Sequence, residues 1–373
     1  MKTILVLTHT TSEDALMSSY VYYHSKAISK LGNRVILFAI NNYFPFFKKK
    51  IKKQIKKIDG IEIHFLNRIS FSNFLENSKI NLNGLSYYNV SKKEIKKILK
   101  NGKIDFIDAH YFKVEGYAAY RLKNKYNIKT SITLHGTSFN NSYHSINGKK
   151  EIIKISKTID YFVCVSEKIQ RMLDKLDIRN SKVIYNGINF YKSNNLIKND
   201  YSIITIGSFT SDKNVDVVIK SFKKVLVKFP AAHLTIVGSG ILKEKLENMC
   251  YNIIDNVKFT GQITNDEVYK YLNQTNIFVL PSSPEGFGIV YAEAMYNKCI
   301  TIGTKGEGID GFIKDKKNGF LVSIDENEIA DLILDILNNK YDLNKIREKA
   351  YLDAKQLTWD KNAKEYIKIM NND

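Results

Sequence analysis

Two glutamates, Glu285 and Glu293, mark the segment whose residue types are best suited to chemistry, 281–294 (PSSPEGFGIVYAEA). The apolar run IFVL precedes this segment and predicts a buried strand, and a helical pattern follows it. Ligands of doubly wound sheets bind at the carboxyl ends of the strands. Two carboxylates about two helical turns apart can accept hydrogen bonds from hydroxyl groups at two places on one elongated, polyhydroxylated ligand. A single glutamate here would more often serve only the helix dipole, so the prediction of a sugar-binding site rests on the whole segment.

Several glycines and one lysine near the same predicted sheet edge are suited to phosphate binding. Gly286 and Gly288 let backbone N–H groups approach an anion at the start of the next helix. Lys213 follows a predicted strand that ends at Gly207, and the helix dipole disfavours a lysine at a helix start unless it has another task. The loop 303–308 (GTKGEG) is equally consistent with phosphate-binding amides and with a flexible turn.

Three histidines of the first half stand at the ends of apolar runs, where the carboxyl ends of strands place side chains beside a ligand. They are His9, His110 and His135, and Gly136 follows the last of them. A lone histidine is more often a structural residue, so the position at a strand end is what makes these three candidates for contacts with a ligand.

The segment 281–294 resembles the E-x7-E signature of retaining glycosyltransferases of the GT-B fold, in particular glycosyltransferase family 4 (group 1). The match includes the preceding Pro-Ser and the EGFG turn. The residues 206–213 resemble the family's G-R-L-x-x-x-K segment, and NGIN at 186–189 resembles its N-G-V-D turn. GSG at 238–240 and NGFLV at 318–322 resemble further turns and strands, so the resemblance extends over nearly the whole chain.

The resemblance implies roles for individual residues. Glu285 would contact the donor sugar, Glu293 the nucleotide ribose and Lys213 the donor pyrophosphate. His135 would lie near the donor sugar and the acceptor. The donor-binding set is Gly207, Ser208, Lys213, Glu285, Gly286, Phe287, Gly288, Ile289 and Glu293, the catalytic set is Glu285, His135 and Lys213, and the acceptor-side candidates are His9, His110 and Gly136.

The chain departs from the family pattern at two places. Ser208 stands where the family has an arginine, which removes one cation from the expected phosphate clamp. The loop after the first strand reads THTTSEDALMSS and lacks the family's paired glycines, so no contacts can be carried over to it.

Strands alternate with helices twice along the chain, which predicts an α/β protein with two doubly wound, Rossmann-like domains and parallel sheets. We expect an acceptor-binding domain over 1–190, a linker over 191–200 and a nucleotide-sugar-binding domain over 201–356. The resemblance implies that the two domains face each other and that a C-terminal helix over 357–373 packs back on the first.

The net positive charge of the chain comes from its first half, and the second half is nearly neutral. Residues 1–195 hold 34 Lys and Arg against 14 Asp and Glu, and residues 196–373 hold 23 against 24. This asymmetry favours an anionic partner for the first half, such as a membrane surface or an acidic polymer. The run 48–57 (KKKIKKQIKK) would place Ile51, Ile55 and Ile58 on one stripe if it were helical, and a solvated loop is an equal alternative.

Several features exclude other classes of site and location. The chain has no D-x-D sequence, so we expect no metal at a nucleotide diphosphate, no other metal and no cofactor. Its three cysteines lie far apart, which is typical of a reducing compartment, and no apolar run approaches the length that spans a bilayer. We therefore expect a cytoplasmic protein, peripheral at the inner membrane face.

The reading that unites these features is a retaining glycosyltransferase of the hexosyltransferase type, which moves a sugar from a nucleotide sugar, by family analogy a UDP-sugar, to a hydroxyl group. The acceptor would be a saccharide or a lipid-linked saccharide of cell-surface polysaccharide or glycolipid synthesis, and an anionic polymer of the teichoic-acid kind is second. A nucleotide-sugar epimerase of the same fold is the alternative enzyme. A nucleic-acid-binding protein is the alternative from another class, although the lysine runs lack interleaved aromatic residues for base stacking, so we expect no nucleic-acid partner.

Overall fold

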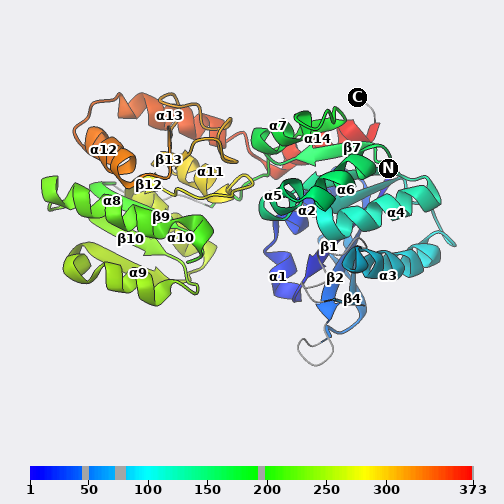
Figure 1. Cartoon of the computed structure of the whole chain (residues 1–373). Coiled ribbons are helices and arrows are strands. Elements are labelled where there is room, and N and C mark those ends of the chain that lie inside the picture. Colours follow the sequence, from blue (N-terminus) through cyan, green and yellow to red (C-terminus); the bar gives the residue numbers. More distant parts are fainter. Residues whose placement is uncertain (44–49, 72–80, 192–197, 372–373) are drawn as a thin grey trace. The chain divides into compact units, whose positions relative to one another are not determined.

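The apolar runs of the sequence form two β-sheets, and each sheet belongs to its own unit of the chain in the computed structural model (Figure 1). Unit 1 comprises Met1–Gly187 together with Trp359–Asp373, and unit 2 comprises Ile188–Thr358. The structure describes residues 1–43, 50–71, 81–191 and 198–371.

Unit 1 is built on an eight-stranded sheet in the order β3-β4-β2-β1-β5-β6-β7-β8. Every neighbouring pair is parallel except β3 and β4, which are antiparallel. Without β3, the order is that of a doubly wound sheet that grows outward in both directions from β1. The strands are β1 Thr3–Thr10, β2 Arg34–Tyr43, β3 Gln54–Ile58, β4 Ile61–Ile69, β5 Phe106–His110, β6 Lys129–Leu134, β7 Tyr161–Cys164 and β8 Ser181–Val183.

Helices cover both faces of this sheet, so its central strands read as continuous apolar runs. Ile4, Leu5, Val6 and Leu7 of β1 are all 0% exposed, although successive side chains point to opposite faces. The helices are α1 Glu13–Met17, α2 Tyr20–Lys30, α3 Leu82–Ile98, a π-helix over Phe112–Gly116, α4 Tyr117–Tyr126, α5 Gly136–His144, α6 Ile146–Ser156, α7 Glu167–Asp174 and the C-terminal α14 Trp359–Asn371.

Helix α14 returns to unit 1 from the far end of the sequence and packs against α2 (Figure 1, red). Its apolar face, which includes Ala363, Tyr366 and Ile369, belongs to the same buried cluster as Ile4 and Val6 of β1. The chain turns into this helix beside Gly187, where a Cβ atom would lie 2.5 Å from the Trp359 ring. A residue with a side chain at this turn would displace the tryptophan.

Unit 2 is built on a six-stranded, fully parallel sheet in the order β11-β10-β9-β12-β13-β14. Its strands are β9 Asn199–Ile206, β10 His233–Val237, β11 Val257–Gly261, β12 Thr275–Val279, β13 Ile300–Thr304 and β14 Phe320–Val322. Its helices are α8 Val215–Lys228, α9 Lys243–Met249, α10 Asn265–Gln274, α11 Ile289–Tyr296, α12 Glu326–Leu337 and α13 Leu343–Ala354, with 3-10 turns over Ser211–Lys213 and Tyr251–Asn256.

Each sheet has one point at which the strand order reverses, and loops that leave neighbouring strands in opposite directions open a crevice there. In unit 1 this point lies between β1 and β5, and in unit 2 it lies between β9 and β12. Doubly wound sheets bind their ligands at this point, so the fold directs attention to the residues that follow these four strands.

The predicted fold class, two α/β domains with parallel sheets, is confirmed. The helical interpretation of 48–57 is wrong where the structure describes the segment, because Gln54–Ile58 forms the antiparallel edge strand β3 and Ile55 is 63% exposed. Residues 48 and 49 lie outside the described residues. The expected linker 191–200 also lies partly outside them, at 192–197, and its last two residues already belong to β9.

No helix within the described ranges is both long enough and apolar enough to cross a bilayer.

Candidate active site

Lys213 and Glu285 form the centre of the site in unit 2. Lys213 ends the 3-10 turn that follows β9, and Glu285 lies in the loop that follows β12, so the two residues flank the reversal point of the sheet. The Lys213 Nζ atom lies 2.7 Å from Glu285 Oε2. Both side chains are largely buried, with 19% and 16% of their surface exposed. The pair is therefore shielded from water on most sides but open to a ligand on one.

Every oxygen of the Glu285 carboxylate already has a hydrogen-bond donor. Oε2 accepts from the Ser282 hydroxyl at 3.1 Å as well as from Lys213, and Oε1 accepts from the Gly286 N–H at 2.9 Å. These contacts fix the carboxylate in one orientation and keep it beside the ammonium group. A group held in this way is preorganised for a ligand and needs little rearrangement to bind it.

Glu307 supports the loop that carries Glu285, and the sequence interpretation did not single it out. Its carboxylate accepts from the Ser283 hydroxyl at 2.8 Å and from the backbone N–H of Glu285 at 2.8 Å. The loops pack so closely that a Cβ atom on Gly308 would lie 2.0 Å from the Gly286 carbonyl oxygen. The glycine-rich loop 303–308 is thus a tightly packed support for the Glu285 loop, and the Glu285 N–H already has a carboxylate partner.

Helix α11 begins directly after the loop that carries Glu285, and no side chain caps its N-terminus. Its N-cap residue is Gly288 at φ +74°, where a Cβ atom would lie 2.5 Å from the Tyr291 ring. A helix start with uncapped N–H groups and the positive end of the dipole is a binding site for an anion such as phosphate.

Glu293 lies one turn into α11 and has a different environment from Glu285. Its side chain is half-buried, and its carboxylate has no hydrogen-bond partner within the described part of the chain. Burial raises the pKa of Glu293 to about 7. A carboxylate with unfilled acceptor positions in a partly buried setting is suited to hydroxyl donors of a ligand.

The remaining donor-site candidates lie in the same loops with different surroundings. Ser208 is exposed and its hydroxyl lies 3.2 Å from that of Thr210, so it replaces the family's arginine without supplying a cation. The Phe287 side chain is 2% exposed and packs edge-on against Phe312, so it contributes to the core of the loop. Gly207 directly follows β9 and lies beside the Lys213 side chain, and Ile289 is the first residue of α11.

In unit 1 the structure brings His110 and His135 together at the carboxyl ends of β5 and β6. His110 Nδ1 lies 3.1 Å from His135 Nε2. His135 precedes Gly136 at the start of α5, and the rings of Tyr20 and Tyr111 lie 4.5 Å and 4.8 Å from its own. Burial lowers the pKa of His135 well below its ordinary value, so the ring is neutral at pH 7.

His9 lies one residue before the end of the neighbouring strand β1 and has a different partner. Its Nδ1 atom lies 2.9 Å from the buried Glu115 carboxylate, while 42% of the His9 side chain is exposed. Burial lowers the pKa of His9, but the charge and hydrogen bond of Glu115 outweigh this and raise it above its ordinary value. His9 is linked to the other histidines through Tyr111, whose ring lies 4.5 Å from its own.

Tyr111 adopts a backbone φ of +75°, a conformation that residues other than glycine rarely take. Strained residues of this kind concentrate at functional sites, where the surrounding structure holds them in place. The strain therefore marks the aromatic and histidine cluster of His9, Tyr20, His110, Tyr111 and His135 as a candidate substrate surface of unit 1.

Comparison with known proteins agrees with the fold. The model of glycosyl transferases group 1 matches residues 188–353, and the model of glycosyltransferase family 4 matches residues 17–191. An uncharacterised glycosyltransferase of Methanocaldococcus jannaschii is 28% identical over 336 residues, which cover 86% of this chain and 93% of that protein. The N-acetyl-alpha-D-glucosaminyl L-malate synthase of Bacillus anthracis is 28% identical over 260 residues, 64% of this chain and 66% of that protein.

Solved structures share the fold over the full length of the chain. Sucrose-phosphate synthase from Thermosynechococcus elongatus superposes with a TM-score of 0.77 at 18% identity, covering 100% of this chain and 99% of that one. The Anabaena protein HepE, in complex with UDP and glucose, superposes with a TM-score of 0.72 at 15% identity and covers both chains completely.

The two doubly wound units and these neighbours define a glycosyltransferase of the GT-B fold. The chain belongs to the group 1, family 4 glycosyltransferases, since the two family models together match residues 17–353.

Proposed function

We propose that this glycosyltransferase transfers a sugar from a UDP-linked donor to an acceptor hydroxyl with retention of configuration at the anomeric carbon. The observation that carries the proposal is the Lys213–Glu285 pair at the reversal point of the unit 2 sheet. It places a cation and a carboxylate 2.7 Å apart beside the uncapped start of helix α11.

The donor would bind along this sheet edge. The Lys213 ammonium group and the N-terminus of α11 would balance the charge of the pyrophosphate, and Glu293 would accept hydrogen bonds from ribose hydroxyls. Glu285 would accept from hydroxyls of the donor sugar. UDP as the carrier is supported by the neighbours HepE, whose structures hold UDP, UDP and glucose, or UDP-glucose, and pneumococcal GtfA, whose structure holds UDP and GlcNAc.

The transfer step needs no covalent intermediate on the protein. The bond between the anomeric carbon and the phosphate oxygen breaks, the acceptor oxygen forms a new bond to the same face of that carbon, and the acceptor proton passes to the leaving phosphate oxygen. Stabilising the charge that develops on this phosphate is the main task of the site, and Lys213 with the helix N-terminus would perform it without a metal ion. His135 would contact the donor sugar as a neutral imidazole.

The test is turnover with a panel of UDP-, GDP- and ADP-sugars and mixed saccharide and lipid acceptors, read by mass spectrometry of the products. Glu285→Gln, which keeps the shape of the side chain, should lower turnover by about 10²- to 10³-fold, since it removes one preorganised electrostatic contact. Glu247→Gln, on the exposed surface of α9, should leave turnover unchanged and serves as the matched control. Equal turnover in all three proteins would refute the site, and conversion of the donor sugar without any acceptor would favour an epimerase.

We further propose that the acceptor carries an anionic group and is used at an anionic membrane surface. The net charge of +20 over residues 1–195 supports this proposal. This net charge already counts the acidic residues that form ion pairs within unit 1, such as Glu13 with Lys56 and Glu94 with Lys53. Sedimentation with vesicles of phosphatidylglycerol should capture the protein at low ionic strength and release it as salt rises towards 1 M. Failure to bind these vesicles at low salt would contradict the proposal, and equal binding to vesicles of phosphatidylcholine would show that charge is not the cause.

A further inference from the structure

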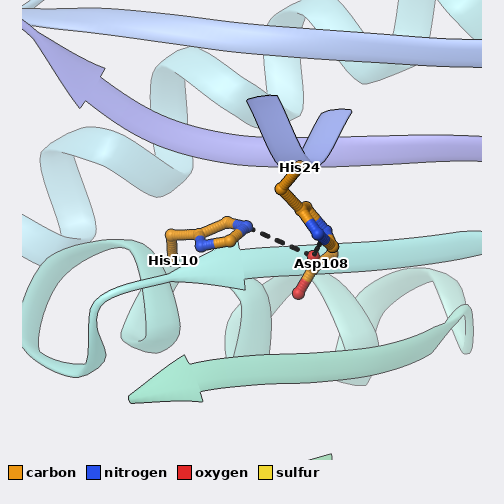
Figure 2. Close-up of side chains that lie close together, drawn as sticks. All are labelled: His24, Asp108 and His110. Atoms are coloured by element: carbon orange, nitrogen blue, oxygen red, sulfur yellow. Dashed lines mark hydrogen bonds and ion pairs between the residues drawn. The ribbon is translucent and has the colours of Figure 1, made fainter. Parts of the chain in front are cut away.

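His24, Asp108 and His110 form a fully buried cluster in unit 1, and the proposed transfer step gives no role to His24 or Asp108. The three side chains come from α2 and β5, and their exposed fractions are 2%, 0% and 2%. Figure 2 shows both imidazole rings pointing at the carboxylate of Asp108. His24 Nε2 lies 3.0 Å and His110 Nε2 lies 3.3 Å from Asp108 Oδ2.

Protein groups alone leave the hydrogen bonds of this cluster incomplete. The Asn362 amide donates from Nδ2 to the Tyr185 carbonyl, so its Oδ1 atom faces His24 as an acceptor. His24 Nδ1 lies 2.7 Å from that oxygen and must therefore carry the proton. A neutral His24 then turns a bare Nε2 lone pair towards the carboxylate.

His110 also lacks a well-formed hydrogen bond to Asp108. Its Nε2 atom is buried and has no hydrogen-bond partner among the described residues, although it lies 3.3 Å from Asp108 Oδ2. Its Nδ1 atom contacts His135 Nε2 at 3.1 Å. If His24 is neutral, two imidazole nitrogens thus converge on one carboxylate oxygen without a well-formed hydrogen bond, and a buried polar atom without a partner is costly.

We propose that a divalent transition metal ion, with zinc as the best match, binds between His24 Nε2, Asp108 Oδ2 and His110 Nε2. Imidazole nitrogen and carboxylate oxygen are the ligands that zinc uses when three protein groups bind it. The ligand atoms all lie within 4.8 Å of one another. Bonds of 2.0–2.2 Å in a tetrahedral site separate the ligand atoms by about 3.3 Å. The two contacts with Asp108 Oδ2, at 3.0 Å and 3.3 Å, are close to this spacing.

The groups around the cluster are those that orient metal ligands. The second nitrogen of each imidazole faces an acceptor, Asn362 Oδ1 for His24 and His135 Nε2 for His110. The second carboxylate oxygen of Asp108 accepts from the Ser131 hydroxyl at 2.8 Å. Metal-bound histidines commonly donate their other N–H in this way, which fixes the ring and the tautomer.

A metal ion here would join three parts of unit 1. It would link α2 to β5 directly, hold α14 through Asn362, and fix His135 through His110. The cluster belongs to unit 1, whereas the residues proposed to bind the pyrophosphate belong to unit 2. A metal ion here would differ from the expectation that the chain binds no metal, but it would take no part in the proposed transfer step. The role is structural, and it holds the C-terminal helix and one site histidine in place.

The first experiment measures the metal content of the full chain, expressed in zinc-supplemented medium and dialysed. The proposal predicts one zinc ion per chain by inductively coupled plasma mass spectrometry. Cobalt introduced during refolding should give the visible absorption bands of a nitrogen- and oxygen-ligated Co²⁺ ion. Trp359, the only tryptophan, lies on the same helix as Asn362, so removal of zinc with a strong chelator should also change its fluorescence.

His24→Gln and Asp108→Asn should each lose the bound zinc, whereas His64→Gln should keep it. His64 is the matched control because it is also buried in unit 1 and also contacts a carboxylate, that of Glu62. If a variant does not fold, the metal content and cobalt spectrum of the native chain still decide. Substoichiometric zinc in the native chain, together with no cobalt spectrum and no zinc-dependent rise in Tm, would overturn the proposal. None of these measurements involves a nucleotide sugar, so they are independent of the proposed function.

Discussion

Replacement of Glu293 by glutamine should raise the stability of the protein at pH 8 while it weakens nucleotide binding. Burial raises the pKa of Glu293 to about 7 from an ordinary 4.5. This difference corresponds to about 3 kcal/mol between the protonated and ionised forms. The variant has the same shape as the wild-type residue but never has to ionise in its partly buried position.

The sign of the pH dependence follows from the two pKa values. Below pH 4.5 the carboxyl group is protonated in the folded and the unfolded chain, and the two proteins should be equally stable. Between pH 4.5 and about 7 only the unfolded chain ionises, so the wild-type protein loses stability as the pH rises. Above pH 7 the loss is complete, and a difference of about 3 kcal/mol corresponds to a Tm higher by roughly 6–12 °C in the variant.

Nucleotide binding should offset the cost of ionising Glu293 in the wild-type protein. Ribose hydroxyls that donate to the Glu293 carboxylate favour its ionised form, so binding should release a proton at a pH of about 6. The loss of a hydrogen bond to a charged group in Glu293→Gln should weaken UDP binding by about 10- to 100-fold.

Calorimetry measures both parts of this prediction. Differential scanning calorimetry at pH 4.5 and pH 8 gives the Tm difference between the two proteins. Isothermal titration with UDP in two buffers of different ionisation enthalpy gives the number of protons released. Glu247→Gln, a surface change on α9, is the control. The reasoning is refuted if Glu293→Gln has no higher Tm than the wild-type protein at pH 8, or if both proteins release the same number of protons.

Three further variants test other parts of the structure. Lys213→Met should lower turnover by about 10²- to 10³-fold in steady-state kinetics, because it removes the cation beside the leaving phosphate, and activity within a few-fold of the wild-type would exclude that role. Gly308→Ala should destabilise the protein by about 1–3 kcal/mol in thermal unfolding and lower turnover, because its methyl group meets the Gly286 carbonyl, whereas Gly102→Ala, with no atom nearer than 3.9 Å, should cost little. Gly187→Ala should shift the fluorescence of Trp359 to the red and lower Tm, and an unchanged emission spectrum would show that the tryptophan is not held against this turn.

The sequence was sufficient to predict the parallel sheets because their strands are short apolar runs that end at glycines or histidines. It failed for β3, whose residues QIKKI continue a lysine-rich run and follow a helical spacing of isoleucines. The strand exists because of its antiparallel pairing with β4, and such pairing is a contact between segments that local spacing does not encode. Lysines along an exposed edge strand also protect it from pairing with other chains.

For the site, the sequence was sufficient to predict which residues lie at strand ends, but not which side chains contact one another. Glu285 and Lys213 were identified from their segments, whereas their ion pair spans 72 residues of sequence and depends on the strand order. His24 lies within an ordinary helix pattern and gave no signal. Asp108 lies two residues before His110 on the same strand, so the two side chains point to the same face, and that spacing was the available sign of their contact.

The measurement that tests the central claim most directly is proton NMR of a reaction mixture with UDP-α-glucose, or the donor that the panel selects, and its acceptor. We expect that the anomeric signal of the donor decays only when the acceptor is present, that a product signal appears with the same anomeric configuration as the donor, and that Glu285→Gln shows neither change on the same time scale. A product of the opposite configuration, or loss of the donor at the same rate in Glu285→Gln, would contradict the proposed retaining transfer.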